Sequence, residues 1–289
     1  MSNIYKKRIQ LLFVLFAGFI WQGCNQINNP VQVPTYIHID SFSFHQTYGF
    51  GVTTHQITSV WAYYNNNPIG SFDLPATIPV ITDGTGQLEL APGVVVDGLN
   101  DLLIAYPFYE MDTFTFAAQP GKVIIHEPYT QFYSDVIDTA ISNFKDFRTN
   151  FAVWEGCGNP MTLVSTDSLT LNGTPVGCLT LTAGTIDSVV DSSVFPFGIP
   201  SGSAFIELDY KCDVPFALGL QANESSISTT PYYFAGIYPS STWQKFYLSV
   251  ADFAGQYKGT NYNFYIKSVL PAGQSSGKIY LDNIQLLHF

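Results

Sequence analysis

The sequence predicts an all-β protein built from two β-sandwich domains, and three observations support this. Of its 289 residues 16% are aromatic and only 11% are charged, and it contains 23 Gly and 17 Pro. This composition suits short strands joined by turns, and the aromatic content excludes a disordered chain. Short stretches of alternating apolar and polar residues recur between Gly, Pro and Asn, whereas no helical period extends over any length.

The first 34 residues have the pattern of a leader and a tether. Residues 6–8 are Lys-Lys-Arg, and residues 11–20 form an unbroken apolar run of ten. This run is too short to span a bilayer and has the length of a signal-peptide core. We therefore expect residues 1–23 to be a signal peptide and residues 24–34 to be a flexible tether.

The apolar run ends in Trp21-Gln22-Gly23-Cys24. This segment resembles a lipobox, although Trp21 stands where Leu is usual, and Asp-(Ser/Thr)-apolar triplets such as Asp138-Thr139-Ala140 resemble a Bacteroidota O-glycosylation motif. The resemblance to a Bacteroidota-type surface lipoprotein implies that a palmitate-bearing Cys24 anchors the protein in the cell envelope, at the periplasmic or outer face of the outer membrane. The alternative is an ordinary secretory signal with an incidental cysteine.

The charge balance bears on the partners of the protein. Acidic residues outnumber basic ones, 22 to 11, and the formal net charge is −11. Phosphate binding requires clustered Lys and Arg, so nucleic acid is excluded as a partner.

Residues 35–128 are expected to form the N-terminal sandwich. The turn signals Asn65-Asn66-Asn67-Pro68 and Asp83-Gly84 separate alternating stretches. From residue 60 to residue 93 this pattern resembles PEGA-like and carboxypeptidase-regulatory-like sandwiches of the Ig type, which implies a spacer or binding module without catalytic residues. The expected strands lie at 36–44, 57–64, 68–73, 77–81, 86–91, 102–106, 113–117 and 121–126.

Residues 129–144 are expected to link the two domains. The nearest approach to a helical period lies in residues 135–148, and it indicates one turn at most. Few apolar residues are expected to bridge this linker, so the two domains should be separable.

Residues 145–289 are expected to form a jelly-roll binding module. Residues 243–248 (WQKFYL) and residues 278–286 (KIYLDNIQL) resemble two strands of the jelly-roll family of carbohydrate-binding and galactose-binding-like modules. Residues 194–210 resemble the approach to its central strand. The resemblance implies an all-β binding module without catalysis.

Three cysteines remain after Cys24, and an odd number leaves at least one unpaired. Cys212 shares the parity of its apolar neighbours and is expected in the core. Cys178 shares the parity of outward threonines, and Cys157 lies in a Gly-flanked loop. A disulfide between these two remains open, and no cysteine spacing indicates zinc.

No motif indicates an enzyme, and no catalytic residue is expected. The chain contains no Gly-x-Ser-x-Gly elbow, no His-Glu-x-x-His and no phosphate-binding Gly loop, and its five His are scattered. A glycosidase needs two carboxylates in one cleft. The acids of the C-terminal half lie mostly on outward strand positions or in loops, as on a solvated face (Glu155, Glu207, Asp209, Asp213, Glu224, Asp252 and Asp282).

A ligand-binding face is expected on two strands. Phe246, Leu248 and Val250 indicate the core side of one strand, and Tyr262, Phe264 and Ile266 that of the other. Flat aromatic rings beside amide and charged groups suit a pyranose ring. The alternative is that these rings pack under a loop or against the N-terminal domain. The side chains predicted to share the outward face are Trp243, Lys245, Tyr247, Asn263 and Tyr265.

Two further segments have alternative interpretations. Residues 232–234 (YYF) and Tyr238 are expected in a loop that either rims this face or pads the sandwich. The apolar parity switches at Asp282-Asn283, which predicts a β-bulge. Related jelly rolls bind structural Ca²⁺ at this end, so Asp282 is a candidate metal ligand; the alternative is an Asp that accepts a backbone N–H at the bulge. No other cofactor is expected.

These observations lead to one functional hypothesis and an alternative. We expect a membrane-anchored extracytoplasmic lipoprotein whose jelly-roll domain binds a glycan or glycoconjugate without catalysis. The alternative is a structural or accessory subunit of a cell-envelope protein assembly, which would use the same aromatic surface against a protein partner. A hydrolase with an unrecognised site is the third interpretation.

Overall fold

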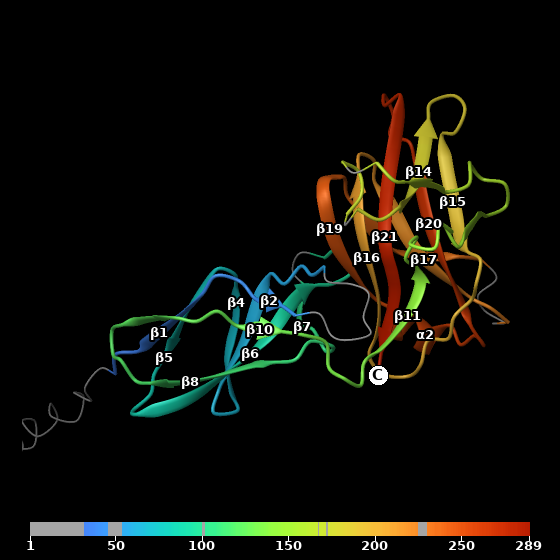
Figure 1. Ribbon diagram of the computed structural model, residues 1–289. Coiled ribbons are helices and arrows are strands. Elements are labelled where there is room, and N and C mark those ends of the chain that lie inside the picture. Colours follow the sequence, from blue (N-terminus) through green and yellow to red (C-terminus); the bar gives the residue numbers. More distant parts are fainter. Residues whose placement is uncertain (1–31, 46–53, 100–101, 167, 172, 225–229) are drawn as a thin grey trace, which may run out of the picture.

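The computed structural model describes residues 32–45, 54–99, 102–166, 168–171, 173–224 and 230–289. They form two β-sandwich domains that lie side by side and meet along one junction (Figure 1). The all-β prediction is confirmed, and the single helix among these residues is the short α2 (Ala251–Gln256). Within the same residues, no helix has the length and apolar character that crossing a membrane requires. The predicted signal peptide and Cys24 lie outside the described residues.

The N-terminal domain packs a three-stranded sheet, ordered β5-β1-β9, against a sheet ordered β4-β3-β6-β7 in which β8 also pairs with β6. Ile37 and Ile78 from the first sheet and Val60 and Leu90 from the second share one buried core. A two-stranded sheet, β10-β2, completes the domain. The strands are β1 (Thr35–Ile39), β2 (Ser43–Phe44), β3 (Ser59–Tyr64), β4 (Asn67–Asp73), β5 (Ala76–Val80), β6 (Thr85–Val95), β7 (Leu103–Ala105), β8 (Asp112–Ala117), β9 (Val123–Ile125) and β10 (Tyr129–Thr130).

The C-terminal domain is a sandwich of two antiparallel sheets. The six-stranded sheet has the order β13-β14-β21-β16-β19, with β11 also paired to β21, and the five-stranded sheet has the order β12-β15-β20-β17-β18. The strands are β11 (Ile137–Ser142), β12 (Phe151–Val153), β13 (Thr162–Val164), β14 (Val176–Thr182), β15 (Ser188–Ser193), β16 (Ala204–Cys212), β17 (Phe216–Ala222), β18 (Tyr232–Ile237), β19 (Ser240–Ser249), β20 (Tyr262–Val269) and β21 (Ser276–His288).

Strand parity sets which side chains fill this sandwich. Phe246 and Leu248 of β19 and Phe264 and Ile266 of β20 all lie in one buried cluster between the sheets. Alternate side chains of a strand point to opposite faces, so the residues between them face away from this core. The inward residues of both strands are therefore as the alternation predicted.

The segment expected to link the domains contains regular structure. Its strand β10 pairs with β2 of the N-terminal domain, and its strand β11 pairs antiparallel with β21. Ile137 lies opposite His288 and Asp138 opposite Leu287. The C-terminal sheet therefore begins inside the expected linker, because the apolar residues of this segment complete a strand and not a helical turn.

The two domains share a hydrophobic cluster at their junction. Tyr106, Phe108 and Phe132 from the N-terminal side pack with Phe205 and Tyr247 from the six-stranded sheet. The Phe108 and Phe205 ring centroids lie 5.8 Å apart, nearly perpendicular. The expectation that few apolar residues bridge the domains is wrong, because these aromatics lie in loops and on outward strand positions that carry no core period.

The three cysteines of the described body are free. Cys212 is buried in the sandwich core, as its parity predicted. Cys178 points away from that core, yet it is also buried, because Val176, Tyr280 and Trp243 pack around it. Cys157 lies beside Ser188, with 3.3 Å between Sγ and Oγ.

Candidate functional site

The residues predicted to share one binding face lie in different sheets. Trp243, Lys245 and Tyr247 belong to β19 in the six-stranded sheet, whereas Asn263 and Tyr265 belong to β20 in the five-stranded sheet. Since these sheets form opposite layers of the sandwich, their outward faces point in opposite directions. The expected common surface is therefore not formed, although the parity within each strand is correct.

The outward face of β19 is covered by the N-terminal domain. Tyr247 is only 1% exposed and Lys245 only 6%. The Tyr247 hydroxyl accepts a hydrogen bond from the Gln56 backbone N–H at 2.9 Å and lies 3.2 Å from the Tyr109 hydroxyl. Neither side chain is open to a surface ligand, so the alternative of packing against the N-terminal domain holds for both.

Two acids expected on a solvated face are buried at the same junction. The Glu207 carboxylate lies 2.9 Å from Lys245 Nζ, and both side chains are almost fully buried. Glu207 also accepts a hydrogen bond from the Tyr106 hydroxyl at 2.6 Å. Asp209 accepts one from Thr54 at 2.8 Å. Alternation predicted a solvated position for Glu207 and Asp209 because it distinguishes the core face of a strand from the opposite face. It does not show whether another domain covers that opposite face.

Electrostatics fixes the charge state of this cluster. Burial lowers the pKa of Lys245, but Asp209 and Glu207 more than offset this and raise it above its ordinary value. Lys245 is therefore charged at neutral pH. Lys245 and its carboxylate partners Glu207 and Asp209 compensate one another's charge in the buried junction, so this cluster has a structural role.

Asp282 lies at the predicted bulge. The pairing of β16 with β21 shifts register between Glu207 and Asp209, and Asn283 has a φ of 48°. The Asp282 carboxylate accepts the Asn283 backbone N–H at 2.8 Å, which is the alternative to a calcium role. In the described residues no group of three or more His, Cys, Asp or Glu could hold a metal. The pKa of Asp282 is raised to about 7, chiefly by burial and in part by the Asp209 carboxylate, while the hydrogen bond from the Asn283 backbone N–H acts in the opposite direction.

The outward face of the five-stranded sheet carries the other two predicted residues. The Tyr265 ring meets Trp154 edge-on at 5.8 Å, and its hydroxyl donates to Gln221 at 2.6 Å. The Asn263 amide donates to the Ser193 carbonyl at 2.6 Å. Tyr265 is 4% exposed, so its ring serves as support under its neighbours more than as a contact surface.

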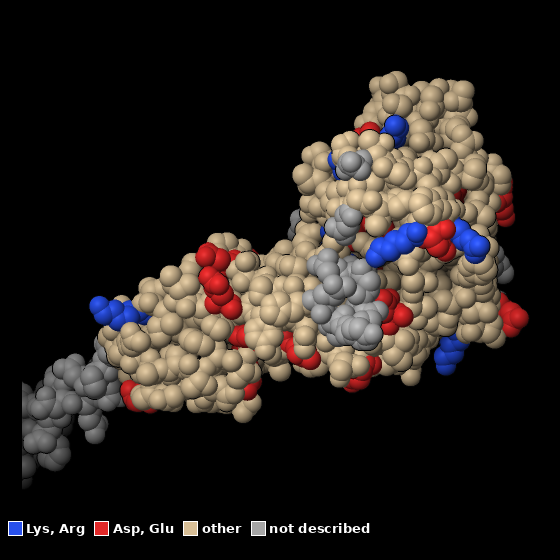
Figure 2. Space-filling view, in the orientation of Figure 1, with Lys and Arg blue, Asp and Glu red and all other residues tan. Residues whose placement is uncertain are grey.

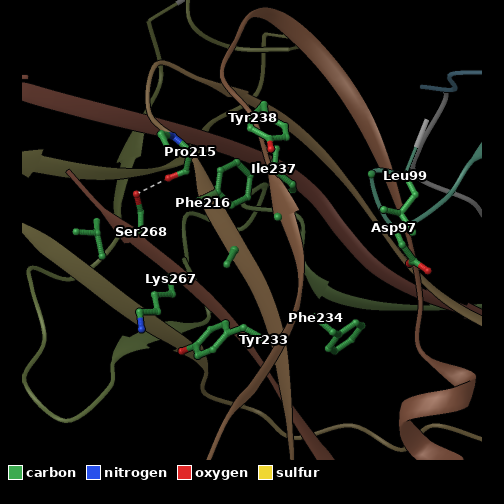
Figure 3. A pocket seen from close by; sticks show the side chains of 14 residues that line it. Asp97, Leu99, Pro215, Phe216, Tyr233, Phe234, Ile237, Tyr238, Lys267 and Ser268 are labelled. Atoms are coloured by element: carbon green, nitrogen blue, oxygen red, sulfur yellow. Dashed lines mark hydrogen bonds between the residues drawn. The ribbon is translucent and has the colours of Figure 1, made fainter. Parts of the chain in front are cut away.

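A hollow of about 670 Å³ lies on this outward face beside β18, and we call it the first hollow. Figure 3 shows Tyr238 and Tyr233 at its two ends, Lys267 beside Tyr233, and Leu99 and Asp97 along one side. Lys267 Nζ lies 5.4 Å from the centre of the Tyr233 ring. Tyr238 is 82% exposed. The hollow therefore combines two aromatic rings, one accessible ammonium group and one carboxylate.

A pair of small residues keeps this hollow open. Ala217 and Gly236 are paired across β17 and β18 at outward-facing positions, so no bulky side chain fills the space between the tyrosines.

Burial, with a contribution from Tyr265, raises the pKa of Tyr233 to about 12. The Tyr233 hydroxyl therefore stays protonated at neutral pH and can both donate and accept hydrogen bonds.

The sequence contained part of the signal for this site. Tyr233 and Tyr238 were expected in a loop, but Tyr233 lies on strand β18 and Tyr238 directly follows it. Lys267 shares the parity of Asn263 and Tyr265 on β20, so the alternation along this strand predicts its outward direction. Asp97 and Leu99 carried no signal, because they belong to the other domain and reach the hollow only through the docking of the two sandwiches.

No family model and no curated protein match this chain. Solved structures do match it in part. The family 11 carbohydrate-binding module of a Clostridium thermocellum cellulosomal cellulase is 18% identical, with a TM-score of 0.39, over 53% of this chain and 95% of that one. A family 29 carbohydrate-binding module is 16% identical, with a TM-score of 0.35, over 53% and 88% of the two chains. These similarities do not indicate which residues of this chain bind a ligand.

Proposed function

We propose that this protein binds a glycan in the first hollow without catalysing a reaction on it. The observation that carries the proposal is the pair of tyrosines at the ends of an open hollow. Lys267 lies beside one of them, and Asp97 lines one side of the hollow. Tyrosine rings remove the apolar face of a pyranose from water, and the hydroxyl, ammonium and carboxylate groups can bond its hydroxyls. Most of the molecular face seen in Figure 2 is uncharged. The described lining of the first hollow carries one ammonium and one carboxylate group, which favours a ligand that is neutral overall and rich in hydroxyls.

The composition of the hollow also bears on catalysis. Glycoside hydrolysis by the common mechanisms needs two carboxyl groups on either side of the scissile bond. Of the described residues that line the first hollow, Asp97 is the one acid. Its Oδ1 accepts the Ser249 backbone N–H at 2.7 Å, so this carboxylate helps to hold the domain junction. The proposed role is therefore recognition.

Removing either tyrosine should weaken binding while the fold persists. Tyr238→Ala and Tyr233→Ala are each expected to weaken glycan affinity about tenfold, because each ring covers one end of the sugar chain. For Tyr238, which is 82% exposed, the free energy of unfolding should change by less than about 0.5 kcal/mol. A glycan array on the soluble 25–289 fragment would identify a ligand, and calorimetric titration would measure both variants.

Tyr129→Ala is the matched control, since this tyrosine is 51% exposed on β10 of the other domain. It should bind as the unmodified protein does. Equal affinity in all four proteins, or no glycan bound by any of them, would contradict the proposal.

We also propose that the protein is held at the cell envelope through a lipid on Cys24. The order of basic residues, apolar run and Gly23-Cys24 supports this. Cys24→Ser should move the protein from the membrane fraction to the soluble fraction and remove labelling by a palmitate analogue. Unchanged labelling of that variant would show that the acyl chain is elsewhere.

A role in an envelope assembly is the second candidate, and one surface favours it. The outer face of the β5-β1-β9 sheet exposes Val123 and Ile125, at 60% and 70%. Exposed apolar side chains on an edge strand are typical of protein contacts. Recovery of a stoichiometric partner from detergent-solubilised envelopes, lost in an Ile125→Asp variant, would support this role.

A further inference from the structure

A second hollow adjoins the first along the junction of the domains. It has a volume of about 420 Å³ and is lined on one side by Gln56 and Thr58, and on the other by Ser240 and Gln244. The two hollows share four lining residues, namely Gly98, Gly236, Ile237 and Tyr238. Each volume is within the range of about 300–1,000 Å³ that small-molecule sites occupy.

The place where the hollows meet is built from two glycines, one from each domain. Gly98 has a φ of +69°, which favours glycine. A Cβ built on Gly98 would lie 3.2 Å from the Gly236 carbonyl oxygen and 3.1 Å from the Phe246 ring. Both glycines are exposed. The backbone of Gly98 therefore lies close to the Gly236 carbonyl group, and neither glycine carries a side chain that could separate one hollow from the other.

The walls along this line come from both domains. Leu99, which is 54% exposed, and Gln56 belong to the N-terminal domain. The highly exposed Tyr238 belongs to the C-terminal domain and lines both hollows. A ring stacked on Tyr238 thus lies at the border between them, and its neighbours in a chain would extend to either side.

We propose that the two hollows form one groove that binds an internal stretch of a linear glycan, with the N-terminal domain as its second wall. This inference rests on the proposed function and assigns to it the class of ligand. A chain that fills both hollows gains the contacts of each without a second loss of translational freedom, so affinity should rise with chain length. A single sugar would gain the contacts of one hollow only.

A larger side chain at Gly236, where the two hollows meet, can obstruct the proposed groove without disturbing the hydrophobic core. A Cβ built on Gly236 would meet no atom within 4 Å, so a larger side chain fits there and projects into the groove. Leu also has a higher strand propensity than Gly, and the Gly236→Leu variant should therefore fold. Gly198→Leu is the matched control, because a Cβ there also meets no atom within 4 Å and Gly198 lines neither hollow.

The probes are linear gluco-, manno- and xylo-oligosaccharides from disaccharide to hexasaccharide, titrated calorimetrically into the full soluble fragment. For the series that binds, the affinity should rise at least about tenfold from disaccharide to hexasaccharide. Gly236→Leu should abolish most of this rise, Leu99→Ala should reduce hexasaccharide affinity severalfold, and Gly198→Leu should do neither.

The outcomes separate the two proposals. Affinity that does not depend on length, or a length dependence unchanged in Gly236→Leu, overturns the groove; the proposed function still stands if Tyr233→Ala weakens binding. Failure of every oligosaccharide to bind overturns both. A thermal melt of Gly236→Leu that matches the control shows that any loss of affinity is not a loss of folding.

Discussion

Lys245→Ala is expected to lower the free energy of unfolding by about 3–5 kcal/mol, because it leaves a buried carboxylate without its cation. The Glu207 side chain is fully buried and Lys245 Nζ lies 2.9 Å from it. Lys245 also donates to Thr54 at 3.3 Å, so the same substitution removes a hydrogen bond between the domains. Urea denaturation followed by tryptophan fluorescence would measure the loss.

A double variant separates the cost of an unpaired charge from the loss of packing. Lys245→Met with Glu207→Gln keeps the volume and removes the closest charge pair but leaves the buried Asp209 carboxylate, so it should recover part of the stability lost by Lys245→Ala. Lys122→Ala, on an exposed residue, is the control and should change the free energy of unfolding by less than about 0.5 kcal/mol. A loss of less than about 1 kcal/mol for Lys245→Ala would mean that water reaches the Glu207 carboxylate.

Phe108→Ala is expected to destabilise both domains together, by about 3–5 kcal/mol. Phe108 is fully buried at the junction, where its ring lies 5.0 Å from Phe289 and 5.3 Å from Tyr106, measured between centroids. Its removal leaves a cavity against residues of the six-stranded sheet. Hydrogen exchange should therefore become faster in β16 and β21 of the C-terminal domain as well as in β6.

Phe147→Ala provides the comparison, since this residue is 71% exposed and buries little apolar surface. It should leave exchange unchanged throughout. If Phe108→Ala accelerated exchange in the N-terminal domain alone, the two sandwiches would be energetically independent and the shared cluster would contribute little to docking.

The periodicity of single strands was sufficient to predict much of the fold. The inward positions of β19 and β20 follow from alternation, because the direction of a side chain on a strand depends only on local backbone geometry. The bulge at Asp282-Asn283 follows for the same reason, since an inserted residue reverses the parity of everything after it. Strand β11 was missed because its residues also fit a short helical turn, and its pairing partner lies at the far end of the chain.

The candidate site depended on information that a strand does not carry. Trp243 and Tyr265 both point away from the core, but the order of strands places them on opposite layers. Asp97 and Leu99 reach the first hollow only because the N-terminal domain docks at the edge of the C-terminal one. No local pattern encodes either relation, since both are set by contacts between residues far apart in the chain.

The sequence by itself determined the all-β class, the inward face of the strands compared above and the position of the bulge, because these depend on composition and on a period of two residues. Only the tertiary structure decided which outward face is covered. Alternation marks a face as distinct from the core, and the same pattern of Glu207, Lys245 and Tyr247 serves a solvated surface or a buried junction. The difference lies in the other domain, which supplies Tyr106, Gln56 and Thr54 to satisfy those groups.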